Sequence, residues 1–124
     1  MQPVDWQVGA KTMLTEQHLE ATGIAIQDST SVNLYFAQHP EMLHITLAVY
    51  ETAKSMFSVS TRFSLMVYVD PEINDRYLTL YVRQQSYDSN ILDQIEQISE
   101  RLHELAKGVS GRLLITTDFQ PVEP

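Results

Sequence analysis

The feature that most constrains the fold is a pair of alternating segments, Arg62–Val69 and Arg76–Arg83, joined by residues 70–75. In both segments apolar residues occupy every second position, which is the period of a strand with one buried face. The connection contains Pro71, which presets the backbone for a turn, among Asp and Asn side chains that bond nearby backbone groups. The sequence therefore predicts an antiparallel hairpin. Its buried face is expected to carry Phe63, Leu65, Val67, Val69, Leu78, Leu80 and Val82.

The residues between these apolar positions must lie on the opposite face of the hairpin. They include tyrosine, methionine and arginine, which are enriched at protein interfaces because they combine a large contact area with polar groups that tolerate water. Three interpretations stay open: a second core layer covered by the N-terminal region, a protein or homodimer interface, or a site for nucleic acid or a small ligand. We define the Tyr/Arg face as Arg62, Met66, Tyr68, Tyr77, Tyr81 and Arg83.

An amphipathic helix is predicted over Asp88–Lys107, with Asp88 or Ser89 as its N-cap and Gly108 as its stop. Apolar residues recur along it at spacings of four and three, which places them in one stripe with acidic and polar residues around the rest of the circle. The helix is therefore expected to cover a sheet with one side only. The stripe consists of Ile91, Ile95, Ile98, Leu102 and Leu105, and Leu92 widens it.

The segment Arg112–Phe119 is apolar at its start and is predicted to be the last strand. A strand, a crossover helix and a second strand favour a right-handed β-α-β unit, with this strand parallel to Arg76–Arg83. A chain of 124 residues is expected to form one domain with its own core. We thus predict a single α+β domain over residues 1–124, with a mixed sheet of three or four strands, helices packed on it, and an extended tail at residues 120–124.

The segments before the hairpin are harder to interpret. Thr12–Ala21 is predicted to be a short helix closed by Gly23, and residues 28–31 a turn or cap. Val32–Ala37 fits either a short strand or the start of a helix. Pro40–Phe57 alternates as a strand would, yet it also has helical spacing behind a proline suited to the first turn. Its length without an internal glycine or proline favours the helix.

Composition limits the classes of partner. Sixteen acidic against eight basic residues give a net charge of −8, which repels the phosphate backbone, so we expect no binding to double-stranded nucleic acid. The absence of cysteine removes disulfides and thiol chemistry and fits a reducing compartment. We find neither a secretory leader pattern nor an apolar run near the ~20 residues that span a bilayer. We expect a cytoplasmic protein that has no membrane contact.

No motif indicates a catalytic residue, a metal site or a cofactor. Asp70, Glu72 and Asn74 have the spacing that begins a calcium loop, but the sixth position lacks glycine and the twelfth lacks glutamate. The glycines do not form a phosphate-binding loop. The alternative to an interaction protein is a small-ligand-binding protein or an enzyme whose site is assembled from residues distant in sequence. The candidates for that site are His18, His44, Glu72 and Asp118.

Near the N-terminus, Trp6, Gly9, Leu14 and the pair His18-Leu19 are similar to the N-terminal signature of a baseplate subunit of type VI secretion. The stretch lacks the proline that precedes the histidine in that pattern, and nothing downstream resembles the family, so we carry no function over. From the Tyr/Arg face we predict a small acidic non-catalytic interaction or adaptor module, expected to be a homodimer, that binds a protein partner or itself.

Overall fold

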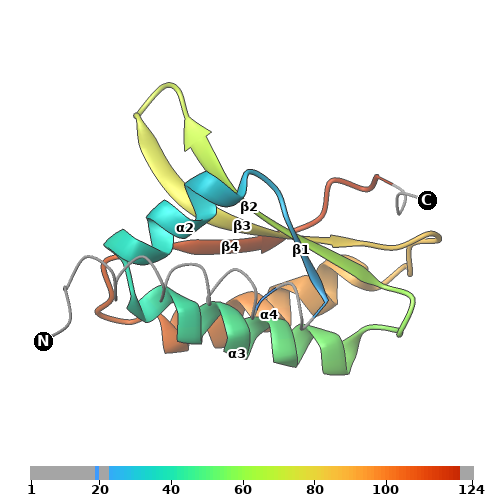
Figure 1. Cartoon of the computed structure of the whole chain (residues 1–124). Helices are drawn as coiled ribbons and strands as arrows, with labels where there is room; N and C mark the ends of the chain where they lie inside the picture. The colour runs from blue at the N-terminus through green and yellow to red at the C-terminus, as the bar shows by residue number, and fades with distance from the viewer. Residues whose placement is uncertain (1–18, 20–22, 121–124) are drawn as a thin grey trace, which may run out of the picture.

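The computed structural model describes residue 19 and residues 23–120. Its strands form one mixed sheet in the order β1-β2-β3-β4, and helices pack on that sheet (Figure 1). The α+β class predicted from the sequence is confirmed. The elements are β1 (Ile24–Ile26), α2 (Ser29–Gln38), α3 (Glu41–Met56), β2 (Arg62–Asp70), β3 (Asp75–Arg83), α4 (Ile91–Leu105) and β4 (Leu113–Thr116).

Strands β2 and β3 form the predicted antiparallel hairpin, and Leu65 lies opposite Leu80 in its register. Both outer pairs, β1 with β2 and β3 with β4, are parallel. The parallel last strand is therefore confirmed, although it is shorter than the predicted Arg112–Phe119. Each hairpin strand also runs one residue further than predicted, because Asp70 and Asp75 pair with each other instead of belonging to the connection. Strand β1 was not predicted, since three residues are too short to show a period.

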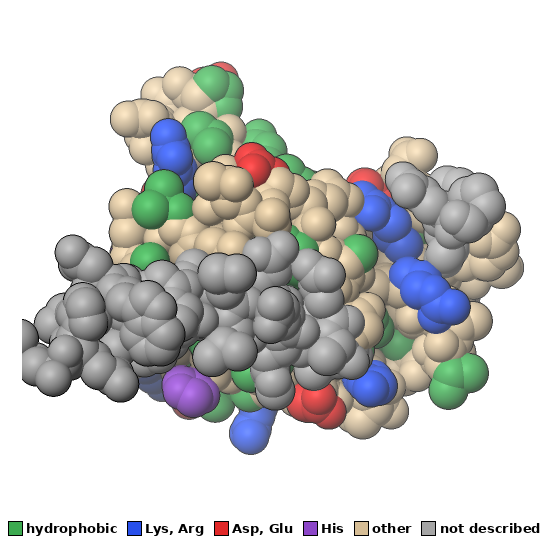
Figure 2. Space-filling model, viewed as in Figure 1, with side chains coloured by type: hydrophobic (Ala, Val, Ile, Leu, Met, Phe, Trp, Pro, Cys, Tyr) green, Lys and Arg blue, Asp and Glu red, His purple; other side chains and the backbone are tan. Residues whose placement is uncertain are grey.

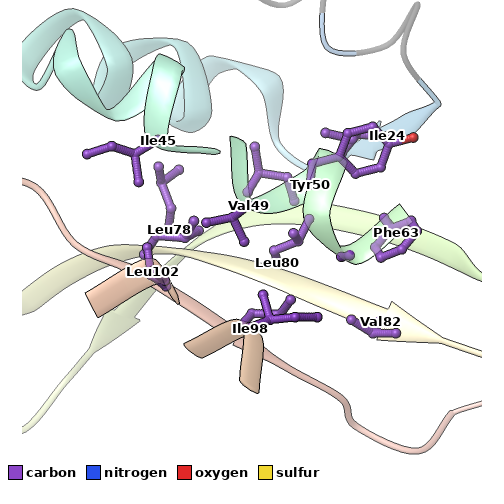
Figure 3. Packing of buried hydrophobic residues seen from close by; sticks show 14 of the residues in the cluster. Ile24, Ile45, Val49, Tyr50, Phe63, Leu78, Leu80, Val82, Ile98 and Leu102 are labelled. Carbon is purple, nitrogen blue, oxygen red and sulfur yellow. The ribbon is translucent and has the colours of Figure 1, made fainter. Parts of the chain in front are cut away.

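The apolar face of the sheet carries the hydrophobic core. Leu78, Leu80 and Val82 have no exposed surface, and side chains from α3 and α4 lie against them (Figure 3). Helix α2 adds its own buried residues to the same core. The helices therefore contribute Val32, Tyr35 and Phe36 from α2, Met42, Ile45, Val49, Tyr50 and Ala53 from α3, and Ile91, Ile95, Ile98 and Leu102 from α4.

The ambiguous segment 40–57 is helical, as favoured: α3 starts after Pro40, and its buried residues follow helical spacing. Glu41 in the first turn and Lys54 in the last suit the helix dipole. In the preceding segment Asp28 caps α2, because its carboxylate accepts bonds from the backbone N–H and the hydroxyl of Ser31. Residues 32–37 are therefore helix and not strand.

Helix α4 departs from its prediction at both ends. Its N-cap is Asn90, so the prediction of Asp88 or Ser89 is wrong; the Asp88 N–H is held instead by the side chain of Gln84 at 3.1 Å. Leu92 is 59% exposed, because it lies about 100° around the helix from Ile91. The stripe ends before Leu105, which is also exposed at the last turn.

The far end of the hairpin projects beyond the helices (Figure 1). Val69, predicted on the buried face, is 44% exposed there because no part of the helical layer reaches it. The predicted helix Thr12–Ala21 lies outside the described residues except for Leu19, which is buried, and residues 121–124 of the predicted tail also lie outside them. Among the helices that the structure describes, none combines the length and the apolarity that a membrane span requires.

Candidate interaction surface

The register of the hairpin brings the six residues of the Tyr/Arg face together. Arg62 lies opposite Arg83 and Tyr68 opposite Tyr77, while Met66 and Tyr81 fall on the rows between them. Since alternate residues of a strand point to one side of the sheet, all six lie on the side away from the core. Arg62 and Tyr68 are exposed and the other four are half-buried.

The described helices do not pack on this face. Every strand residue that belongs to the hydrophobic core lies on the opposite side of the sheet, and the buried residues of the helices join that same core. Within the described part of the chain, the Tyr/Arg face is therefore not the floor of a second core layer. It is one surface of a sheet whose other surface carries the core, except at the projecting end where Val69 is exposed.

The centre of the face is closed by large side chains around a small one. Thr79 is only 2% exposed, because its cross-strand neighbours on this face are the larger side chains of Met66 in β2 and Leu114 in β4. Tyr77 and Tyr81 flank Thr79 along its own strand. Leu114, which is 42% exposed, was not assigned to the face from sequence. Leu113, Leu114 and Ile115 are all apolar, so no sequence alternation marks Leu114, and only the burial pattern of β4 places it on this face.

One end of the face is aromatic. The rings of Tyr68 and Tyr77 lie 5.4 Å apart, and the Arg112 guanidinium lies 4.1 Å from the centroid of the Tyr77 ring. This cation–π contact is joined by an ion pair of 3.2 Å between Arg112 and Asp75. Arg112 was missed because it precedes a strand whose register the sequence alone does not give. These contacts form an aromatic surface with charged groups at its edge.

The other end of the face is basic. Arg83 makes a bidentate contact with Asp118, with distances of 3.3 and 2.9 Å, and this hydrogen bond is the main cause that lowers the pKa of the Asp118 carboxyl. Directly across the strand pair, Arg62 donates through Nη1 to the carbonyls of Val59 and Thr61 at 3.3 and 3.4 Å. Two arginines thus stand side by side, and like charges in that position repel.

A shallow pocket of about 210 Å³ lies beside these arginines. Gln27 donates to the Ser64 hydroxyl at 2.8 Å in its wall. The described lining contains no acidic residue, but Arg83 is paired with Asp118, so the positive potential of the pocket comes mainly from Arg62. Its lining is Gly23, Ala25, Gln27, Arg62, Phe63, Ser64 and Arg83.

The residues of the alternative enzyme site do not meet where they are described. Glu72 lies in the hairpin turn and Asp118 contacts Arg83 at the opposite end of β3; nine residues of strand separate these ends by about 27 Å. His44 is exposed on α3, and His18 lies outside the described residues. Across residues 19 and 23–120, no group of three His, Asp or Glu side chains is placed to hold a metal ion.

Sequence reasoning missed a second polar cluster. The Ser110 hydroxyl donates to Glu41 at 2.9 Å and lies 2.8 Å from Nδ1 of His39. The backbone N–H of Glu41 and the Ser110 hydroxyl lower the pKa of the Glu41 carboxyl. In a catalytic triad the imidazole stands between hydroxyl and carboxylate, whereas here the hydroxyl is the middle group. The cluster fastens the loop before β4 to the α2–α3 junction, and contacts so distant in sequence leave no local signal.

The chain matches no protein-family model, no curated protein and no solved structure. The likeness of residues 6–19 to a type VI baseplate subunit therefore has no support from these comparisons.

Proposed function

We propose that this protein is a non-catalytic interaction module that self-associates through its Tyr/Arg face. The observation that carries the proposal is the difference between the two sides of one sheet. The described helices join a core on one side only, while half-exposed tyrosine, methionine and arginine side chains fill the other. Tyrosine buries a large area at small cost in side-chain entropy, and tyrosine, methionine and arginine are all enriched at protein interfaces.

The shape of the face suits a second copy of the chain. Sheets pack face to face at about 10 Å with their strands close to aligned, and a two-fold dimer needs one surface that is complementary to itself. Three tyrosines, Met66 and the exposed Leu114 supply the apolar centre of such a contact. The small residues Ser64 and Thr79 lie lower among them, which gives the surface relief that a second copy can fill.

Charge supports a partner that is acidic, as this protein is. Arg62, Arg83 and Arg112 are three of only eight basic residues in a chain with sixteen acidic ones, and all three contact or belong to this face. Asp118 and Asp75 pair with Arg83 and Arg112, so Arg62 is the basic group that would attract an acidic group of the partner. We also propose a cytoplasmic location, which the lack of cysteine supports.

The pocket beside Arg62 and Arg83 supports a second candidate function, the binding of a small anion. Its volume of about 210 Å³ lies below the range of drug-sized ligand pockets, so a carboxylate or phosphate group fits it better than a nucleotide. Isothermal titration with acetate and inorganic phosphate tests this candidate. Saturable binding by a chain that stays monomeric would favour it over self-association.

The experiment for the main proposal is sedimentation equilibrium on the wild type, Tyr77→Ala and Leu92→Ala. Tyr77 belongs to the face, whereas Leu92 is an exposed apolar residue of α4 in the helical layer. We expect Tyr77→Ala to weaken self-association about tenfold, as an interface aromatic does, and Leu92→Ala to leave it unchanged. The effect of Arg83→Ala on association would be harder to interpret, because this change also removes the ion pair with Asp118. Equal effects of the two variants would contradict the proposal.

A further inference from the structure

The Tyr/Arg side of the hairpin carries opposite charges at its two ends. The first row pairs Arg62 with Arg83 and the last pairs Asp70 with Asp75. The strands alternate without interruption between these rows, so the acidic pair lies on the same side as the basic pair. Figure 2 shows acidic atoms at the projecting tip of the molecule, a basic side chain just below the tip, and several basic side chains on the opposite side of the molecule.

We infer that two copies of this chain pack face to face with their hairpins reversed, so that Arg62 of each copy meets Asp70 of the other. The inference rests on the proposed self-association and adds its geometry. Only two directions of a two-fold axis in the interface keep the strands of the copies close to aligned. One lies along the strands and the other lies across them.

The charges at the two ends of the hairpin favour one direction of the two-fold axis over the other. An axis along the strands places the Arg62–Arg83 row of one copy on the same row of the other, which brings four guanidinium groups together at one end and four carboxylates together at the other. An axis across the strands places the basic row on the acidic row at both ends. Juxtaposed like charges cost several kcal/mol at an interface, while complementary ones fix the register, so the second direction is favoured.

Within the chain, the two end rows are only half neutralised. Arg83 is paired with Asp118, and Asp75 is paired with Arg112. By contrast, Arg62 contacts only backbone carbonyls, and Asp70 accepts only the Glu72 backbone N–H at 3.0 Å. Among the residues that the structure describes, neither has an ion-pair partner. Arg62 and Asp70 are thus the charges that a second copy would complement.

The surroundings of Arg62 have space for that carboxylate. The pocket beside Arg62 opens on the Tyr/Arg side, and Gln27 and Ser64 add polar groups to its wall. The same reversal superposes β2 on β2, so that the small Ser64 of one copy faces Tyr68 of the other and Met66 faces itself. On β3 the reversal places Tyr77 opposite Tyr81 and Thr79 opposite itself, so one small residue opposes a large one on β2 and aromatic rings meet on β3.

A charge exchange tests this geometry. Arg62→Asp and Asp70→Arg each place two pairs of like charges in a homodimer, so we expect each variant alone to self-associate at least about tenfold more weakly than the wild type. An equimolar mixture restores both opposite-charge pairs in the heterodimer, and its affinity is expected within about threefold of the wild type. Sedimentation velocity with one variant fluorescently labelled measures all three affinities.

Each outcome decides between the alternatives. Tighter association of Arg62→Asp would show that the axis lies along the strands and would overturn the inference. Weak association of the mixture would show that Arg62 and Asp70 do not meet, while the proposed function would still stand if Tyr77→Ala disrupts the dimer. A monomeric wild type would overturn both. Both sites are on the surface, and Arg62→Glu with Asp70→Lys repeats the test if one of the first variants does not fold.

Discussion

Leu80 and Tyr81 are neighbours in β3, yet they belong to two regions with different roles. Leu80 has no exposed surface and contacts the helical core, whereas Tyr81 is half-exposed on the Tyr/Arg face. The backbone of one hairpin therefore supports both a surface committed to folding and a surface that the described helices leave uncovered. The comparison shows that tyrosine and methionine on a strand need not be core residues when no described helix covers them.

The two faces are also held by different forces. On the core side, burial of a leucine contributes about 1.5–3 kcal/mol. On the other side, the interactions include partly exposed ion pairs and ring contacts, and an exposed ion pair contributes at most about 1 kcal/mol. Substitutions on the first face should therefore act on stability, and those on the second should act mainly on association.

The largest expected effect is that of Leu80→Ala compared with Tyr81→Ala. We expect Leu80→Ala to reduce the free energy of unfolding by about 3 kcal/mol, because it leaves a cavity in a fully buried site. Tyr81→Ala should cost about 1 kcal/mol or less, since its ring is already half in water. Urea denaturation below the concentration of self-association measures both. Equal losses would mean that the two faces are equally committed to folding.

A smaller effect is expected from Thr46→Val on the core side. Thr46 is fully buried in α3, and its hydroxyl has no hydrogen-bond partner among the residues that the structure describes. Its replacement by a methyl group of similar size removes that cost, so the free energy of unfolding should rise by about 1 kcal/mol. Thr79→Val is the matched change beneath the Tyr/Arg face, where the hydroxyl is also unpaired. A loss of stability in both variants would contradict the assignment of unpaired hydroxyls.

The smallest effect concerns the ion pair between Arg83 and Asp118. Its contacts hold the pKa of Asp118 below the ordinary value of 3.8. A carboxylate with a lowered pKa in the folded state stabilises the fold above the unfolded pKa, and this contribution is lost as the pH falls through the folded value. Wild type should therefore exceed Asp118→Asn by at most about 1 kcal/mol at pH 7, and the two should converge below pH 3.8. A difference that persists in acid would exclude this cause.

Much of the fold was predictable because alternation assigns each residue of a strand to a face without knowledge of its surroundings. The same rule placed the six residues of the Tyr/Arg face on one surface. The alternation rule does not apply beyond the last apolar residues of the two strands. It therefore assigns Asp70 and Asp75 to the connection, although they form the last paired row of the hairpin and the acidic end of the face. Arg112 was missed for another reason, since its contact with Tyr77 depends on the parallel register of β4.

The most direct test of the central claim is light scattering behind size exclusion, on wild type, Tyr81→Glu and Leu92→Glu at low and high salt. Both variants add one acidic charge, but Tyr81 lies on the Tyr/Arg face and Leu92 in the helical layer. We expect the wild type and Leu92→Glu to have twice the mass of the 14.2 kDa chain, and Tyr81→Glu to be monomeric. High salt should weaken the dimer in part, because its end charges are screened. A wild type that stays monomeric, or a Tyr81→Glu variant that stays dimeric, would contradict the account.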